Sequence, residues 1–237
     1  MLKEFVEKIV LLAEAKTQFI EGRTYSDKYI FPVEAPTAKP LAINTLTGIV
    51  DYLAKEVDLA RDHSCAIHIG SHTNVSVISP LNKDSFMGRN YYLVAEHKSP
   101  VFRFGEWYGV EAFIIALQSQ FIQDLETAMI LKVAGNVKEE GVTQFTDDGV
   151  TQAVTAKSGI ARVEQVAVPN PVTLRAFRTF REVTQPASTF IFRMRGEKGF
   201  PPSCALFEAD GKMWQLEAID NIKVWLMNAL PDVPVIG

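Results

Sequence analysis

The spacing of the apolar residues changes along this 237-residue chain, and that change limits which fold class it can adopt. Apolar side chains recur every three or four positions, as in amphipathic helices, in residues 2–18, 45–57, 109–122, 124–134 and 217–230. Alternating or continuous apolar runs predict strands at 65–69, 75–78, 91–95, 160–168, 203–208 and 212–216. Helices and strands are grouped rather than alternating. We therefore expect an α+β fold with antiparallel sheets, hairpins and segregated helices.

Two segments of the chain are expected to be extended: an arm after the first helix and the C-terminal tail. Pro32, Pro36 and Pro40 break helical structure within residues 24–43, so the N-terminal helix is followed by a proline-rich arm. Such an arm either wraps its own domain or reaches a neighbouring subunit. The apolar tail, residues 233–236, is expected to dock as an edge strand.

The chain is expected to divide into three segments: a helix and arm (1–60), a β-hairpin and helix-pair region (61–135), and a β-rich region closed by a C-terminal helix (136–237).

The charge pattern argues against two broad classes of protein. A net charge of −4 and a pI near 5.6 give no overall attraction to nucleic acid or to an anionic membrane. No uncharged stretch reaches the ~20 residues that span a bilayer. Cys65 and Cys204 lie far apart in apolar runs, which predicts two buried free thiols. The apolar N-terminus is interrupted by charged residues, which the apolar region of a signal peptide does not contain: Glu4, Glu7, Lys8 and Glu14. We therefore expect a cytoplasmic protein without a membrane partner.

Three histidines lie close together in the sequence and are the candidate metal ligands: His63, His68 and His72. Histidine is the commonest metal ligand, so this cluster is where a metal site would be sought. If 66–70 is a strand, His68 points to the face opposite Ile67 and Ile69. No metal-binding motif supports the cluster, and histidines without a metal are the simpler interpretation.

Motifs of catalysis are absent from the sequence. It contains neither a Gly-x-Ser-x-Gly nucleophile elbow nor a glycine-rich phosphate loop. Asp148 precedes a glycine, as in a turn, so the nearby carboxylates do not indicate an acid–base pair. We expect a non-enzymatic protein with no catalytic residue and no cofactor.

The segment 172–200 combines basic and aromatic residues. It contains six cations and two carboxylates, Glu182 and Glu197, so its local charge is +4 and the rest of the chain carries −8. Strand alternation places the phenylalanines of 189–195 in the core and the arginines outside. An anionic ligand or an acidic partner surface is the alternative use of these cations: Arg175, Arg178, Arg181, Arg193, Arg195 and Lys198.

Five stretches of the chain resemble one uncharacterised protein family of bacteriophages and prophages. The likeness extends over about residues 66–237, and it implies a phage-encoded protein made in the cytoplasm of the infected bacterium. The family implies no established activity. The stretches are HIGSHTNVSVISPL (68–81), FRFGEWYGVEAFIIALQSQF (102–121), GNVKEEGVTQFTDDGVTQAVTAKSGIA (135–161), VAVPNPVTLRAFRTFREVTQPASTFIFRMRG (166–196) and CALFEADGKMWQLEAIDNIKVWL (204–226).

Three functions are compatible with these patterns. The helix with its arm, the apolar tail and the uneven charge favour a self-assembling homo-oligomer, either a closed ring or a cage. The first alternative is a binder (sponge) of a nucleotide-type small ligand in counter-defence, using the arginine and phenylalanine segment. The second alternative is a single-stranded nucleic-acid-binding protein of phage replication, which predicts salt-dependent binding through Arg193 and Arg195.

Overall fold

The fold class is α+β, as the apolar spacing predicts. The chain separates into two compact units, Met1–Ala38 and Lys39–Gly237. No helix in the part of the chain described here is long and apolar enough to cross a membrane. The computed structural model describes residues 2–13, 15–20, 23–27, 38–60, 64–82, 88–98, 102–140, 142–147, 152–158, 162–196 and 202–237.

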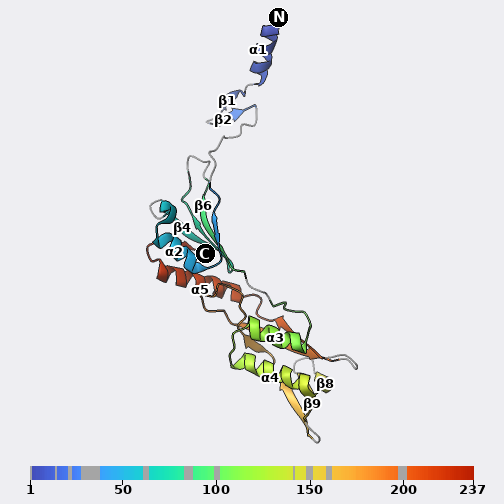
Figure 1. The fold of residues 1–237 in the computed structure, drawn as a ribbon. Coiled ribbons are helices and arrows are strands. Elements are labelled where there is room, and N and C mark those ends of the chain that lie inside the picture. The colour runs from blue at the N-terminus through green and yellow to red at the C-terminus, as the bar shows by residue number, and fades with distance from the viewer. Residues whose placement is uncertain are drawn as a thin grey trace. The chain divides into compact units, whose positions relative to one another are not determined.

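The first unit contains one helix and one small hairpin (Figure 1). Helix α1 (Leu2–Ala13) is followed by β1 (Thr17–Ile20), which pairs antiparallel with β2 (Arg23–Ser26). The backbone N–H of Lys16 donates to the carboxylate of Asp27 at 2.7 Å and closes the open end of the hairpin. Every side chain whose burial is described in this unit is exposed, so the unit has no hydrophobic core of its own there.

A mixed five-stranded sheet lies in the second unit, in the order β14-β4-β5-β6-β3. Helices α2 and α5 contact β6 and β4 respectively, and they contact each other (Figure 1). Their buried faces share one core with the sheet, centred on Leu46, Ile67, Val77 and Ile222. The bounds are β3 Leu41–Ile43, α2 Leu46–Ala54, the 3₁₀ turn η1 Val57–Leu59, β4 Ala66–Ser71, β5 Asn74–Ile78, β6 Tyr91–Glu96, α5 Trp214–Ala229 and β14 Val235–Ile236.

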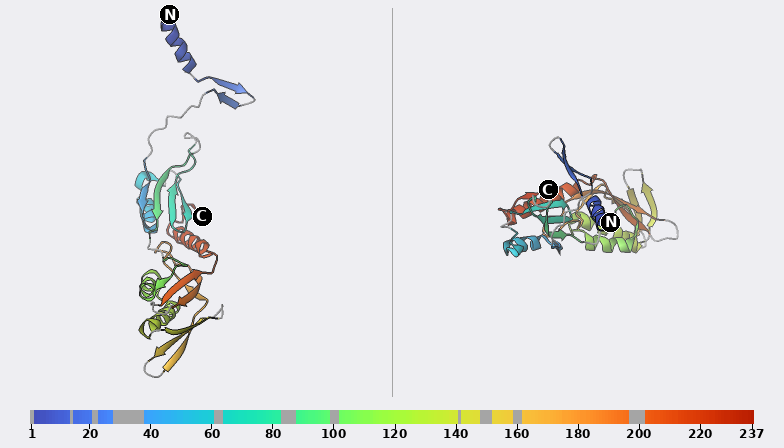
Figure 2. Two further views of the ribbon diagram at one scale, coloured as in Figure 1. Left: turned by 90° about the vertical axis from the view of Figure 1, so that its right-hand side faces the viewer. Right: turned by 90° about the horizontal axis from the view of Figure 1, so that it is seen from above.

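The second core of this unit is formed by a four-stranded sheet, in the order β11-β12-β13-β7, and two helices. The left view of Figure 2 shows the yellow-green helices α3 and α4 beside the orange strands of this sheet. Phe113 of α3 stacks on Phe192 of β12 with ring centroids 5.5 Å apart. The bounds are β7 Tyr108–Gly109, α3 Val110–Gln120, α4 Leu125–Glu140, β11 Val172–Leu174, β12 Ser188–Arg195 and β13 Ser203–Glu208.

A third sheet of two successive hairpins follows α4 in the sequence. Its order is β10-β9-β8, and both pairings are antiparallel. β10 agrees with the strand expected at 160–168, whereas the turn expected at Asp148 lies outside the described residues. The bounds are β8 Val142–Asp147, β9 Gln152–Ser158 and β10 Arg162–Val168.

The prediction for the C-terminal tail is confirmed, and that for the arm is tested only at its ends. β14 pairs parallel with β4 at the edge of the five-stranded sheet. At the other edge, β3 pairs parallel with β6, so the last residues of the segment 24–43 belong to the second unit. Residues 28–37, with Pro32 and Pro36, lie outside the described chain.

Three predicted elements are wrong in their extent. The helix expected at 124–134 continues as α4 to Glu140. The first helix ends at Ala13 instead of residue 18, because the β-prone run Thr17–Ile20 pairs with β2. The expected hairpin between 203–208 and 212–216 does not form. Its first strand exists as β13, but after the turn at Gly211 (φ +62°) the chain enters α5 at Trp214. A buried stripe at helical spacing overrides the short strand pattern there: Trp214, Ala218, Ile222 and Leu226.

Candidate functional site

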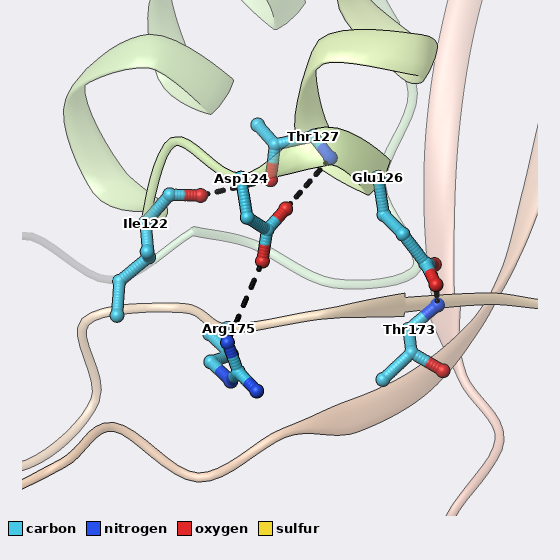
Figure 3. A network of polar contacts seen from close by, with 6 residues as sticks. All are labelled: Ile122, Asp124, Glu126, Thr127, Thr173 and Arg175. Atoms are coloured by element: carbon cyan, nitrogen blue, oxygen red, sulfur yellow. Dashed lines mark hydrogen bonds and ion pairs between the residues drawn. The ribbon is translucent and has the colours of Figure 1, made fainter.

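Arg175, one of the six candidate cations, takes part in a structural network (Figure 3). Asp124 caps α4 by accepting a hydrogen bond from the backbone N–H of Thr127 at 2.9 Å. The guanidinium of Arg175 lies 3.8 Å from the same carboxylate, and Glu126 of α4 accepts a 2.7 Å hydrogen bond from the N–H of Thr173 in β11. These contacts fasten the start of α4 to β11, so the structure gives Arg175 a role in packing.

Arg193 and Arg195 lie on the outward face of β12, as the strand alternation predicts. The inward residues Phe190 and Phe192 are fully buried, and Met194 is 2% exposed. The guanidinium of Arg195 lies over the ring of Trp107 at 4.3 Å, whereas Arg193 is half-buried. These two cations therefore lie on the opposite face of the sheet from its core.

Arg181 is exposed, and its guanidinium lies 4.8 Å from the centre of the Phe177 ring, on the loop that follows β11. Arg178 belongs to the same loop. Lys198 falls outside the described residues. Of the six candidate cations, the structure brings Arg178 and Arg181 onto one loop and distributes Arg175, Arg193 and Arg195 over other elements.

Arg178 is the buried member of the set, with a side chain only 5% exposed. Its Nη1 donates to the carboxylate of Glu208, at the end of β13, at 2.6 Å, and its Nη2 donates to the hydroxyl of Ser188. Burial lowers the pKa of Arg178 from its ordinary value, and Glu208 opposes that shift. The side chain is thus a cation held in a poorly solvated place by one carboxylate.

Aromatic rings surround the same guanidinium. Its central carbon lies 3.9 Å from the ring centre of Trp214, 5.0 Å from that of Phe104 and 5.5 Å from that of Phe190. Phe104 and Phe190 are themselves stacked at 5.0 Å. Ring faces carry negative partial charge, so this cage compensates part of the hydration that the cation loses on burial.

The loop carrying Arg178 is fixed by one buried amide, that of Gln185. Its Oε1 accepts hydrogen bonds from the backbone N–H groups of Arg178 (3.1 Å) and Thr179 (3.3 Å). Its Nε2 donates to the carbonyls of Phe180 (2.9 Å) and Val183 (3.3 Å). Because one side chain takes the place of regular secondary structure, this loop is rigid without being a helix or a strand.

Two histidines at the end of the five-stranded sheet face this loop. The hydroxyl of Thr179 donates to the carbonyl of His72 at 2.5 Å, and the N–H of His97 donates to the carbonyl of Thr73 at 2.8 Å. The His72 ring meets Trp214 edge-on, with centroids 4.7 Å apart. The ends of two sheets and the start of α5 therefore converge around Arg178.

A cavity of about 440 Å³ opens at this convergence. Three cations line it, Lys98, Arg178 and Lys212, against the single carboxylate of Glu208. Its aromatic walls include Phe104, Phe177 and Trp214, and His72 and His97 complete the polar part. The arrangement can hold a small molecule that offers negative charge and an apolar ring.

The candidate metal ligands are separated by the structure as far as it describes them. His68 is half-buried on β4, opposite the buried Ile67 and Ile69 as expected, whereas His72 is in the cavity wall. His63 lies outside the described residues. Among the residues described, no three histidine, cysteine, aspartate or glutamate side chains are grouped so that they could hold a metal ion.

Both cysteines are buried thiols that form no disulfide, as predicted. Burial raises the pKa of Cys204 to about 12. Because only the thiolate is a strong nucleophile, Cys204 is inert at neutral pH.

The sequence did not predict several residues of this site, among them His97, Lys98, Phe104, Glu208, Lys212 and the buried Trp214. The position of His97 could have been predicted. If 74–78 pairs antiparallel with 91–96, His97 follows the second strand and lies beside the turn that precedes residue 74. Glu208 ends a predicted strand thirty positions from Arg178, and nothing in the sequence links the two. The spacing of Trp214 from later apolar residues was the signal for its helix, but the turn before it suggested a hairpin instead.

The two cavity histidines predict a loss of stability in mild acid. Burial is the main cause that lowers the pKa of His72 below 6.5, helped by Arg178 and His97. Burial also lowers the pKa of His97, helped by Arg181 and opposed by Glu182. Below about pH 6.5 these histidines bind protons in the unfolded chain but remain largely neutral in the folded chain. The free energy of unfolding therefore falls as pH falls.

Urea unfolding at about pH 7.5, 6.5 and 5.5 measures this effect. We expect a decrease that starts near pH 6.5 and that becomes smaller when both histidines are replaced (His72→Asn with His97→Asn). An unchanged pH dependence in this double variant would assign the loss of stability to other groups.

Comparison with known protein-family models, curated proteins and solved structures found no match to this chain in any of the three.

Proposed function

We propose that this protein is a phage- or prophage-encoded, non-catalytic protein that works as a self-assembling homo-oligomer in the cytoplasm of the infected bacterium. The observation that carries the proposal is the exposed apolar surface of α1, whose large apolar side chains are 49–79% exposed. The resemblance of residues 66–237 to phage and prophage proteins supports the origin. The proposal contains no catalytic step.

The apolar face of α1 is a stripe that needs a partner. Leu2, Phe5, Val6 and Ile9 recur every three or four positions along the helix. A single helix of this length is marginally stable in water unless such a stripe is packed against another surface. The described residues of the first unit leave the stripe exposed, and we place its partner on another copy of the chain.

Helix α5 offers a matching surface on another copy. Met213 at its start and Leu216, Val224 and Met227 along it are 50–72% exposed and lie on one face of the helix, with Asp220 and Lys223 between them. At 1.5 Å per residue this second stripe is about 20 Å long, close to the length of α1. We assign the α1 stripe of one copy to the α5 stripe of another, with ridges of one helix packed into grooves of the other.

Native mass spectrometry of the full chain, purified from a bacterial host, tests the assembly. We expect a complex of several 26.4 kDa subunits. Replacing Phe5 and Ile9 with glutamate should reduce the subunit number, and Leu216→Glu with Val224→Glu should do the same from the other side. Glutamate in a helix–helix contact leaves a buried unpaired charge, which is strongly destabilising.

Leu11→Glu is the matched control. Leu11 is as exposed as its neighbours, but two residues correspond to about 200° around a helix, so it lies opposite Ile9. The proposal requires Leu11→Glu to keep the wild-type subunit number. A wild-type chain that stays monomeric at micromolar concentration would overturn it, and so would equal dissociation by Leu11→Glu.

A further inference from the structure

The cavity beside Arg178 has the size and composition of a small-molecule site. Its volume of about 440 Å³ lies within the range of roughly 300–1,000 Å³ that ligand pockets occupy. We propose that this cavity binds a small organic anion with a planar aromatic ring, of the nucleotide class. This inference is independent of the assembly through α1.

The charge of the lining selects an anion. Lys98, Arg178 and Lys212 outnumber Glu208, and Glu208 is already engaged by Arg178 at 2.6 Å. Lys98 lies 3.5 Å from Glu96, but both side chains are largely exposed, so that contact is weak and exchangeable. A phosphate group can therefore bind Lys98 and Lys212 at the rim while Arg178 sets a positive potential from beneath.

The aromatic walls select a planar ring. Phe104 and Phe177 line the cavity as half-buried rings, and Trp214, 6% exposed, lies behind them against Arg178. Nucleotide bases of any kind stack on aromatic rings such as these phenylalanines. Trp214 and Phe104 are already held by contacts with Arg178, and Phe177 by its contact with Arg181. The walls are thus ordered before a ligand arrives, and binding does not have to pay for ordering them.

Unpartnered polar atoms concentrate at the same place. Within the described residues, Nε of Arg178, Nε1 of Trp214 and Nε2 of His97 are buried without a hydrogen-bond partner, and all three residues line this cavity. Arginine and tryptophan nitrogens are donors, and a histidine nitrogen can be one. Buried donors without an acceptor are costly. These nitrogens have almost no accessible surface, so they favour an anion in the cavity through the positive potential of their N–H groups and not by direct contact.

The N-terminus of α5, which is the positive end of the helix dipole, does not bind the anion. The amides of Gln215 and Leu216 in its first turn already donate to carbonyl oxygens of the preceding residues, at 3.0 and 3.1 Å. The anion is therefore recognised by side chains, which makes the site testable by substitution.

Isothermal titration with four nucleoside diphosphates (ADP, GDP, CDP and UDP), adenosine and inorganic phosphate tests the proposal. We expect at least one diphosphate to bind once per chain, more tightly than adenosine or phosphate alone. Lys212→Gln should weaken it about tenfold, the value of one charge-assisted contact. Lys223→Gln is the matched control, because Lys223 lies on α5 but does not line the cavity. Thermal unfolding confirms that both variants fold.

Several results would overturn the proposal. These are no heat with any diphosphate at millimolar concentration, phosphate alone binding as tightly as the best diphosphate, or equal weakening by Lys223→Gln. A single-stranded oligonucleotide that binds more tightly than every diphosphate would replace the small-ligand site with a nucleic-acid surface. None of these results affects the assembly test, which uses α1 and the exposed stripe of α5.

Discussion

Replacing Glu208 with glutamine is expected to lower the free energy of unfolding by about 3 kcal/mol, because it leaves the buried cation of Arg178 without its counter-charge. The guanidinium is 5% exposed and its Nη1 lies 2.6 Å from the Glu208 carboxylate. The glutamine can still accept a hydrogen bond, but it carries no charge. The aromatic cage and the Ser188 hydroxyl remain, and they compensate only part of the lost hydration.

A second ion pair in the chain supplies the matched control. Arg103 and Glu106 are 3.6 Å apart, with side chains 75% and 59% exposed. Glu106→Gln should change the unfolding free energy by less than about 0.5 kcal/mol, because water and salt screen an exposed pair. The same measurement on Arg178→Met with Glu208→Gln should recover much of the loss, since the unpaired charge is then gone. A loss as small in Glu208→Gln as in Glu106→Gln would mean that Arg178 is adequately hydrated.

The burial of Arg178 could not be predicted from the charge pattern of the sequence. Composition correctly identifies 172–200 as basic and aromatic, but it cannot separate an arginine that faces water from one enclosed by rings. In β12 the two-residue period makes that separation, so Phe190 and Phe192 were predicted inside and Arg195 outside. The loop containing Arg178 has no period. Its conformation depends on Gln185 and its charge on Glu208, and neither relation is visible in local spacing.

The elements were predictable where apolar spacing was regular over many residues. Helices at 46–54 and 110–120 and the strand pair at 66–78 lie close to their predicted places, whereas α4 continues to Glu140, six residues past its predicted end at 134. Errors occur where two patterns compete over a few residues. At 212–216, a turn signal and a short apolar run suggested a strand, whereas the longer stripe that begins at Trp214 stabilises a helix. A helix forms there because its apolar stripe packs into the core beside β4.

Gln185→Leu is expected to lower the free energy of unfolding by about 3 kcal/mol or more, because it removes the partner of several buried backbone groups at once. Gln185 is 3% exposed, and its amide pairs with the N–H groups of Arg178 and Thr179 and with the carbonyls of Phe180 and Val183. Leucine has a similar volume but no polar atom. Each buried amide or carbonyl left without a partner costs roughly 1–3 kcal/mol, and the loop can relieve only some of them by moving toward water.

Gln118→Leu is the control for this substitution, because Gln118 is exposed on α3 and the same change there should stay within about 0.5 kcal/mol. Gln185→Glu separates the two halves of the network. A carboxylate keeps the acceptor for Arg178 and Thr179 but loses the donor to Phe180 and Val183, and it adds a buried charge, so it should be no more stable than Gln185→Leu. Urea unfolding compares the three variants. If Gln185→Leu lost less than about 1 kcal/mol, the loop would be held by Arg178 and its cage instead of by the amide.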